Sequence, residues 1–266
     1  MCVGFCVCGA NSEKGSTSKL EPFLYDKFFE VEEKHWWFKA RTEIIFDLLS
    51  NRIGLPEGSK ILDIGCGTGG PLLRFNSKFD AWGIDISDQA IDYCRKRGLR
   101  NVSSCDIQEF VQDHKDFKLV TLLDVIEHVD DDVSFLKHAS DALAEDGLVL
   151  VTVPAYPFLW SQHDVVNHHK RRYTKRTLTS SMSKAGLDLR YLSHYNTILF
   201  PLAVLQRYLE KLSRTNSDSE LNIPDGTVNS LFYRIFSSEK SLLKHTVLPF
   251  GVSLIAIAGK CAQTNP

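Results

Sequence analysis

Long apolar segments are missing from this sequence of 266 residues. No run reaches the roughly 18 apolar residues that a membrane-spanning helix needs. The N-terminus has no basic start followed by an apolar stretch, so we expect no secretory signal. The chain also lacks a strong excess of positive or negative charge. Its 31 Lys and Arg against 33 Asp and Glu leave a net charge of −2. This balance offers no general attraction to nucleic acid, so we expect no nucleic-acid partner, although local basic patches stay open.

A disulfide framework is also missing. The seven cysteines are odd in number and show no regular spacing, which predicts reduced thiols and a cytoplasmic location. Cys2, Cys6 and Cys8 lie within residues 1–20, which we interpret as a flexible tail. An alternative is S-acylation of these cysteines, which would make the protein membrane-associated. A zinc site is disfavoured because no second ligand pair lies nearby.

Residues 21–58 carry a helical pattern with a break near His35, and we interpret them as an N-terminal helical cap. Strand and helix patterns then alternate, which predicts parallel strands joined by right-handed crossovers. One expected helix covers 87–97, with Ser87 as its N-cap and Gly98 as its C-cap. The other expected elements are a helix at 132–143 and strands at 60–64, 81–84, 102–104, 119–123 and 148–153.

The last third of the chain predicts a helix over 174–185 and strands over 187–195 and 252–258. The sequence from 198 to 212 is apolar with helical spacing, and we expect a helical insertion around 198–247. Its aliphatic surface is expected to pack on the sheet, or else to form an apolar acceptor pocket or a peripheral membrane contact.

The stretch LDIGCGTGG carries the most chemical information. Gly65, Gly67 and Gly70 fit the dinucleotide pattern G-x-G-x-x-G, whereas Gly65, Gly67 and Gly69 fit G-x-G-x-G. The stretch follows the first expected strand, and ligands of open parallel sheets bind beyond the carboxyl ends of the strands. Asp85 ends the second strand and suits a ribose diol, which NAD and S-adenosylmethionine share.

Three features separate these two ligands. Asp63 precedes the glycines, where a carboxylate would repel a pyrophosphate but suits the cationic amino group of S-adenosylmethionine. Asp106 follows the third strand and is placed to accept from the adenine amino group, with Ile107 packing on the base. The fourth strand ends in LLDVIEHV, and no lysine or tyrosine spacing of a hydride-transfer site lies nearby. The sequence therefore favours S-adenosylmethionine.

Five motifs occur in order between residues 60 and 154: LDIGCGTGG, GIDIS, CDIQEF, LLDVIEHV and GLVLVTVP. On these motifs the sequence resembles the class I S-adenosylmethionine-dependent methyltransferases, in particular the type 11 and type 23 groups. HWWFKAR and LWSQHDVVNHHKRRYT are similar to segments of one subgroup, many of whose members are linked to lipid, glycan or natural-product modification. The resemblance implies an α/β methyltransferase domain over 59–266. Its fold would be Rossmann-like and doubly wound, with a seven-stranded, mostly parallel sheet, an antiparallel last strand and helical cap insertions.

S-adenosyl-L-methionine is the cofactor that the resemblance implies. The loop glycines would meet its methionyl end, Trp37 would offer an aromatic face to the sulfonium, and Arg41 would pair with the methionyl carboxylate. The alternative is a core tryptophan and a surface arginine. The expected cofactor-binding residues are Trp37, Arg41, Asp63, Gly65, Gly67, Gly69, Asp85, Ile86, Asp106, Ile107, Leu123 and Asp124.

Asp124, Glu127 and His128 raise the question of a metal. A similar acid-x-x-Glu-His segment binds a divalent metal in some catechol O-methyltransferases of ubiquinone biosynthesis and in small-RNA end-methylating enzymes. Here the first acid is Asp rather than Glu, and the same pattern occurs in relatives without metal, so we expect none. Asp124 is expected to shape the cofactor site, with His128 near the methyl group.

The segment 163–173 follows the fifth strand and is expected to overhang the acceptor pocket. Arg171 or Arg172 would hold a phosphate or carboxylate of the acceptor, unless the loop is a solvated basic one or its arginines pair with local acids such as Asp164. Histidine has a pKa suited to general-base catalysis at neutral pH. The catalytic candidates are His128, His163 and His168.

We predict methyl transfer to a small-molecule acceptor at a hydroxyl oxygen, the acceptor being lipid- or glycan-like. Two alternatives stay open: a non-catalytic protein that binds S-adenosylmethionine, and an NAD-dependent oxidoreductase. A nucleic-acid methyltransferase would need a basic face that the net charge does not supply. The sequence leaves the oligomeric state open.

Overall fold

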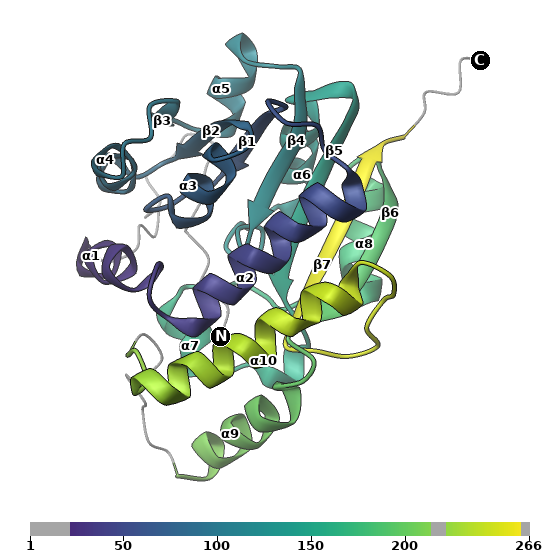
Figure 1. The fold of residues 1–266 in the computed structure, drawn as a ribbon. Coiled ribbons are helices and arrows are strands. Elements are labelled where there is room, and N and C mark those ends of the chain that lie inside the picture. Colours follow the sequence, from purple (N-terminus) through teal and green to yellow (C-terminus); the bar gives the residue numbers. More distant parts are fainter. Residues whose placement is uncertain (1–21, 214–221, 262–266) are drawn as a thin grey trace.

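The computed structural model describes residues 22–213 and 222–261, and Figure 1 shows their fold. The expected tail, with Cys2, Cys6 and Cys8, lies outside these residues. Seven strands form one sheet in the order β3-β2-β1-β4-β5-β7-β6. The strands are β1 (Lys60–Ile64), β2 (Asp80–Asp85), β3 (Val102–Ser104), β4 (Phe117–Leu123), β5 (Leu143–Pro154), β6 (Leu187–Tyr195) and β7 (Ser253–Lys260).

Strands β1 to β5 pair in parallel, and β7 runs antiparallel to both of its neighbours, β5 and β6. The expected Rossmann-like sheet with an antiparallel last strand is therefore confirmed. The strand order reverses between β1 and β4, and open sheets of this kind bind ligands at the carboxyl ends of the strands at that point.

Most element boundaries shift by one or two residues from expectation, and the largest shift is at the start of β5. β5 begins at Leu143, five residues before the predicted strand, because Leu143 pairs with Phe117 of β4. The helix expected to reach residue 143 ends at Asp141 for the same reason.

Helices cover both faces of the sheet. One face carries α1, α2, α3, α4 and α10, which share an apolar core with Ile61 and Ile257. The other carries α5, α6 and α8, which share a core with Leu62 and Ala256. The α-helices of the described residues are α1 (Pro22–Val31), α2 (Trp36–Asp47), α3 (Gly70–Asn76), α4 (Asp88–Lys96), α5 (Ile107–Asp113), α6 (Asp132–Asp141), α7 (Gln162–Val166), α8 (Lys175–Lys184), α9 (Phe200–Ser213) and α10 (Gly226–Leu243). None of them is both long and apolar enough to cross a membrane.

Local signals fix where these helices start and stop. Ser87 Oγ accepts a hydrogen bond from the N–H of Ala90 at 3.3 Å, and Gly98 follows α4 with φ 84°. Both expected caps of α4 are thus confirmed. The break expected near His35 is confirmed as well, because its Nδ1 accepts from the N–H of Trp37 and begins α2.

The insertion contains two helices, where the sequence indicated only the first. α10 packs beside α2, with Trp36 at ring-centroid distances of 5.3 Å from Phe232 and 6.0 Å from Phe236. Asn229 of α10 also accepts a hydrogen bond from the N–H of Trp36 at 2.8 Å. The cap and the insertion therefore lie together on one face of the sheet, and α9 lies beyond α10 at the edge of the molecule (Figure 1).

Candidate active site

The loop after β1 shows which glycine pattern the backbone requires. Gly65, Gly67 and Gly69 have φ values of 71°, 52° and 83°, a region that L side chains rarely adopt. Gly70 starts α3, and a Cβ added to it would lie 2.6 Å from Oε2 of Glu32. Three glycines therefore serve the backbone path of a G-x-G-x-G loop, and the fourth makes room for a side chain from the cap.

Two buried carboxyl groups flank this loop. Oδ1 of Asp63 accepts a hydrogen bond from Oγ1 of Thr121 at 2.6 Å. The two oxygens of Asp85 accept from the N–H groups of Gly67 and Ser87, at 3.0 and 2.9 Å. Burial raises the pKa of each carboxyl, Asp63 and Asp85, to about 7. Asp85 therefore shapes the loop itself and leaves further lone pairs for a ligand.

Glu32, between α1 and α2, is a residue of this site that the sequence did not indicate. Its Oε2 accepts hydrogen bonds from Oγ1 of Thr68 at 2.5 Å and from the N–H of Gly70 at 3.1 Å. The guanidinium of Arg97 lies 3.2 Å from the same oxygen, and both side chains are almost fully buried. Burial raises the pKa of Glu32 even against this positive charge. The cap is thereby tied to the glycine loop.

The other cofactor residues expected on strands β2 to β4 lie at the same edge of the sheet. Asp106 follows β3, and its Oδ1 accepts from the N–H of Gln108 at 2.7 Å, which starts α5. Its Oδ2 is buried without a hydrogen-bond partner among the described residues. Ile107 and Leu123 are buried, and Ile86 is half-buried. One acceptor atom and three apolar side chains thus lie near these strand ends, and their contact with an adenine ring stays a prediction.

Arg41 joins the cap to the ends of β4 and β5. Its Nη2 lies 2.7 Å from Oδ2 of Asp124 and donates to Oγ1 of Thr152 at 3.3 Å. Its guanidinium also lies over the ring of Trp37, 5.1 Å from the centroid. Trp37 and Arg41 are both buried, so the surface arginine of the alternative interpretation is wrong, whereas the core tryptophan is confirmed. Their contacts with a cofactor stay a prediction.

A buried cluster lies just beyond Asp124. The ligand-type atoms of Glu127, His128 and His169 lie within 4.8 Å of one another, and all three residues are buried. Neither carboxylate oxygen of Glu127 has a hydrogen-bond partner among the described residues. Burial raises the pKa of Glu127 well above its ordinary value, and the nearby charge of Asp124 raises it further. The cluster offers a carboxyl and two imidazoles, a donor set that would suit a divalent cation as well as a proton.

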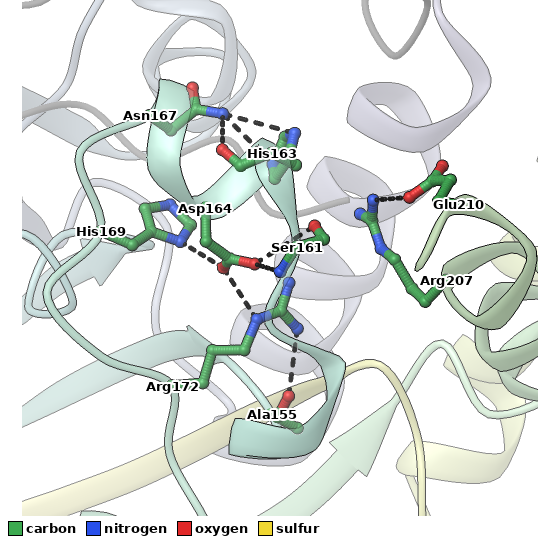
Figure 2. Close-up of polar contacts among 9 residues, drawn as sticks. All are labelled: Ala155, Ser161, His163, Asp164, Asn167, His169, Arg172, Arg207 and Glu210. Carbon is green, nitrogen blue, oxygen red and sulfur yellow. Dashed lines mark hydrogen bonds and ion pairs between the residues drawn. The ribbon is translucent and has the colours of Figure 1, made fainter. Parts of the chain in front are cut away.

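Asp164 orients one of these imidazoles (Figure 2). Its Oδ1 lies 2.8 Å from Nδ1 of His169 and 2.7 Å from Nε of Arg172, while its Oδ2 accepts from the N–H of Ser161 at 2.9 Å. Burial opposes ionisation, but the bond from His169 and the charge of Arg172 hold the pKa of Asp164 below its usual range. Burial lowers the pKa of His169. With Nδ1 facing Asp164, Nε2 is left for the cluster, where it has no partner among the described residues.

The three histidines expected to be catalytic lie at different depths. His128 is buried in the cluster, with its ring centroid 4.7 Å from that of His169. His163 is half-buried beside Asn167, 6.0 Å from the ring of His169. His168 is exposed and has φ 56°. The sequence did not single out His169, because nothing local distinguishes it within the His-His-Lys run.

The arginines of the loop after β5 follow the alternative in which they pair with local acids. Arg172 pairs with Asp164 and donates to the carbonyl of Ala155 at 3.2 Å. Arg171 donates to the carbonyls of Val129 and Asp130 at 2.9 and 2.7 Å. These bonds brace the loop against the end of β4, so the two guanidinium groups have structural partners within the chain.

The family model that matches this chain is described as a methyltransferase domain and covers residues 36–192. A ubiquinone biosynthesis O-methyltransferase from Actinobacillus pleuropneumoniae is 32% identical over 141 residues, which are 46% of this chain and 60% of that protein. A probable (S)-tetrahydroprotoberberine N-methyltransferase 2 from Papaver bracteatum is 31% identical over 118 residues, 41% of this chain and 33% of that protein. The chain thus spans between a third and three fifths of these two curated relatives.

Solved structures share the fold. A SAM-dependent methyltransferase from Archaeoglobus fulgidus superposes with a TM-score of 0.54 at 22% identity, covering 90% of this chain and 99% of that one. A phosphoethanolamine N-methyltransferase 2 from Haemonchus contortus, solved with S-adenosyl-L-methionine, has a TM-score of 0.52 at 16% identity, covering 89% and 60%.

Proposed function

This chain belongs to the methyltransferase domain family, with S-adenosylmethionine as its cofactor, and we propose that its acceptor is a hydroxyl oxygen of a small molecule. The observation that carries the proposal is the Asp164-oriented imidazole of His169, which meets His128 and Glu127 beside the end of β4. A hydroxyl acceptor needs a base to take its proton, whereas an amine needs one less and a thiolate hardly at all.

The residues around the glycine loop suit the cofactor. The buried carboxyl of Asp63 would face the cationic amino group, Asp85 the ribose hydroxyls, and the open Oδ2 of Asp106 the adenine amino group. S-adenosylmethionine supplies a methyl group already activated by its sulfonium. Holding donor and acceptor in line accounts for on the order of 7–11 kcal/mol of barrier lowering in favourable cases.

His169 is the base that the contacts favour. Its lowered pKa keeps the imidazole neutral at physiological pH, and the carboxylate of Asp164 selects the tautomer with the proton on Nδ1. Nε2 then accepts the hydroxyl proton. His128 and His163, which flank this ring, stay candidates for a second contact with the acceptor. His168, which is exposed, stays a prediction of the sequence alone.

We keep a lipid- or glycan-like acceptor as part of the proposal, and apolar residues near the cluster favour the lipid-like one. A cavity of about 70 Å³ lies between α2, α9 and α10, with Trp36, Leu199 and Phe232 in its lining and Arg172 at its border. Arg172 also pairs with Asp164, and Asp164 in turn bonds the imidazole of His169. The cavity is therefore linked to the oriented imidazole through these two side chains. The name of the ubiquinone O-methyltransferase relative supports oxygen, and that of the poppy relative keeps nitrogen as the competing acceptor.

The test is transfer of a labelled methyl group from S-adenosylmethionine to panels of phenols, sugar hydroxyls, lipid headgroup hydroxyls and amines. We expect label only on hydroxyl acceptors. Label only on amines would overturn the oxygen assignment. Binding of S-adenosylhomocysteine without transfer to any panel would support the non-catalytic alternative.

A further inference from the structure

Two cysteines meet against the glycine loop. Cys66 belongs to the loop itself, and Cys94 lies on α4, 28 residues further along the chain. Their Sγ atoms are 3.9 Å apart, and both side chains are buried free thiols. Of the other two cysteines that the structure describes, Cys105 is half-buried and Cys261 is exposed. The fold thus brings together two nucleophilic groups that no step of methyl transfer uses.

Cys94 also contacts the backbone of the loop. Its Sγ donates a hydrogen bond to the carbonyl oxygen of Gly67 at 3.1 Å. The N–H of Gly67 in turn donates to Oδ2 of Asp85 at 3.0 Å. A Cβ added to Gly69 would lie 2.8 Å from Sγ of Cys94, so the loop passes close to this sulfur. The path of the loop is therefore coupled to the positions of the two sulfur atoms.

A disulfide between the two cysteines would change these contacts. The sulfur atoms of a disulfide are about 2.05 Å apart, so Cys66 and Cys94 would have to approach each other from 3.9 Å. A disulfide has no S–H, so the carbonyl of Gly67 would lose its bond from Cys94. The same Gly67 is bonded to Asp85, which we expect to face the ribose hydroxyls. The reduced loop, rather than the oxidised one, therefore has the shape that suits the cofactor.

The folded loop protects these thiols. The hydrogen bond with Cys94 and burial raise the pKa of the Cys66 thiol well above its ordinary value. The thiolate is the form that attacks an oxidant, so the thiols react slowly while the loop is folded. Local opening of the loop would expose Cys66 to solvent and restore its ordinary reactivity. A bound cofactor favours the folded loop, so it should also slow oxidation.

We propose that Cys66 and Cys94 form a peroxide-sensitive dithiol whose disulfide lowers the affinity for S-adenosylmethionine. The thiolate of one cysteine attacks the O–O bond of hydrogen peroxide, which yields a sulfenic acid and hydroxide. The thiolate of the other attacks the sulfenic sulfur, the S–S bond forms, and the sulfenic oxygen leaves as a second hydroxide. With the two thiol protons, the products are one disulfide and two water molecules. The proposal rests on the proposed binding of the cofactor at the glycine loop, and it does not involve the acceptor.

The test is treatment of the full chain with hydrogen peroxide, followed by peptide mapping without reduction and by calorimetric titration with S-adenosylhomocysteine. We expect a peptide linked through Cys66 and Cys94. The affinity should fall about tenfold or more, because hydrogen bonds at the loop are displaced, and dithiothreitol should restore it. S-adenosylhomocysteine present at about ten times its Kd should slow the linkage about tenfold, because the ligand-free form is the one that reacts.

Two variants are the controls. C94S cannot form the disulfide, so its affinity should be the same before and after peroxide. C261S removes an exposed cysteine and should form the link and lose affinity as the wild type does. The proposal would be overturned by the absence of the linked peptide in the ligand-free wild type, by a linked peptide with unchanged affinity, or by an equal loss in C94S. A reduced wild type that binds no S-adenosylhomocysteine would overturn the cofactor assignment as well.

Discussion

The carboxylate of Asp164 and the imidazole of His169 form an oriented pair, with Oδ1 2.8 Å from Nδ1 and both side chains fully buried. Arg172 holds Asp164 from another side at 2.7 Å. Such a carboxylate fixes the tautomer of a histidine and stabilises the imidazolium that forms when the ring takes a proton. The pair sits against the strand end that carries His128, because the N–H of Lys170 donates to the carbonyl of Glu127 at 2.7 Å.

The first prediction concerns the general base. H169A should lower turnover by about 10²- to 10⁴-fold, the usual contribution of a positioned base, with little change in affinity for S-adenosylhomocysteine. H168A should lower turnover by no more than a few-fold, because His168 is exposed. Turnover is measured with any acceptor found in the labelled-methyl panels. An equal loss in both variants would contradict the assignment of His169.

Asp164 is a positioning residue, and the second prediction separates that role from a purely structural one. The reaction needs neutral His169, so the rate rises with pH through the pKa of this group, which lies below its ordinary value. Asp164 raises that pKa through its charge and hydrogen bond. D164N should therefore move the acidic limb of the pH–rate profile to lower pH while reducing the plateau. A lowered plateau with an unmoved limb would indicate a structural role only.

The third prediction is a pH dependence of cofactor binding. Asp63 and Asp85 have folded-state pKa values of about 7, raised from 3.8. Their contribution to the stability of the protein alone is therefore complete below pH 3.8 and lost as the pH rises through about 7. S-adenosylhomocysteine needs the ionised carboxylates, so its affinity should change in the opposite direction. Calorimetry should give about tenfold weaker binding at pH 6 than at pH 8 for each carboxylate involved. D63N should flatten this dependence, and an equally steep one in D63N would contradict it.

The fourth prediction concerns the tie between the cap and the glycine loop. E32A removes the buried one of the two carboxylates that pair with Arg97, whose side chain is 3% exposed, and it leaves Oγ1 of Thr68 and the N–H of Gly70 without their acceptor. Loss of one partner of a buried pair costs about 3–5 kcal/mol of unfolding free energy. E33Q is the control, because Glu33 contacts the same arginine from a side chain that is 60% exposed, and it should cost about 0–1 kcal/mol. Chemical denaturation measures both, and similar losses would contradict the account.

The fifth prediction concerns the ionisation of Glu127. Its pKa is raised by folding, so the carboxyl takes up a proton when the chain folds at neutral pH. The free-energy cost of this protonation grows as the pH rises above the pKa of the unfolded chain. E127Q should therefore unfold at the wild-type midpoint near pH 5 and at a higher midpoint at pH 8. A rise in the wild-type midpoint on adding Mn²⁺ or Zn²⁺, absent in E127Q and H169A, would contradict this. It would show that a cation ionises the carboxyl.

The parts of the site that follow from the sequence are local. These parts all lie within a few residues of strand ends, so one short motif predicts both the strand and the residue that follows it. They are the loop glycines with positive φ and the acids Asp63, Asp85 and Asp106. The sheet topology follows from the same alternation of strands and helices, with right-handed crossovers leaving few other arrangements.

The parts that the sequence did not indicate depend on contacts between distant segments. Glu32 meets Thr68 from 36 residues away, and no local pattern in the run around Glu32 marks it. His169 is chosen over His168 by backbone conformation, because φ 56° at His168 leaves that ring exposed while Asp164 captures its neighbour. The sequence did not indicate α10, because its apolar residues face α2, a partner that the sequence alone does not identify.

We propose that two separate groups of residues serve the reaction. The carboxyls of Asp63 and Asp85 bind the cofactor, and the buried cluster of Glu127, His128 and His169 acts on the acceptor. The most direct test is calorimetric titration of the wild type, D63N and H169A with S-adenosylhomocysteine, with NAD as the parallel ligand. We expect micromolar binding to the wild type and to H169A, much weaker binding to D63N, and none of NAD. Binding of NAD in place of S-adenosylhomocysteine, or loss of S-adenosylhomocysteine binding in a folded H169A, would contradict it.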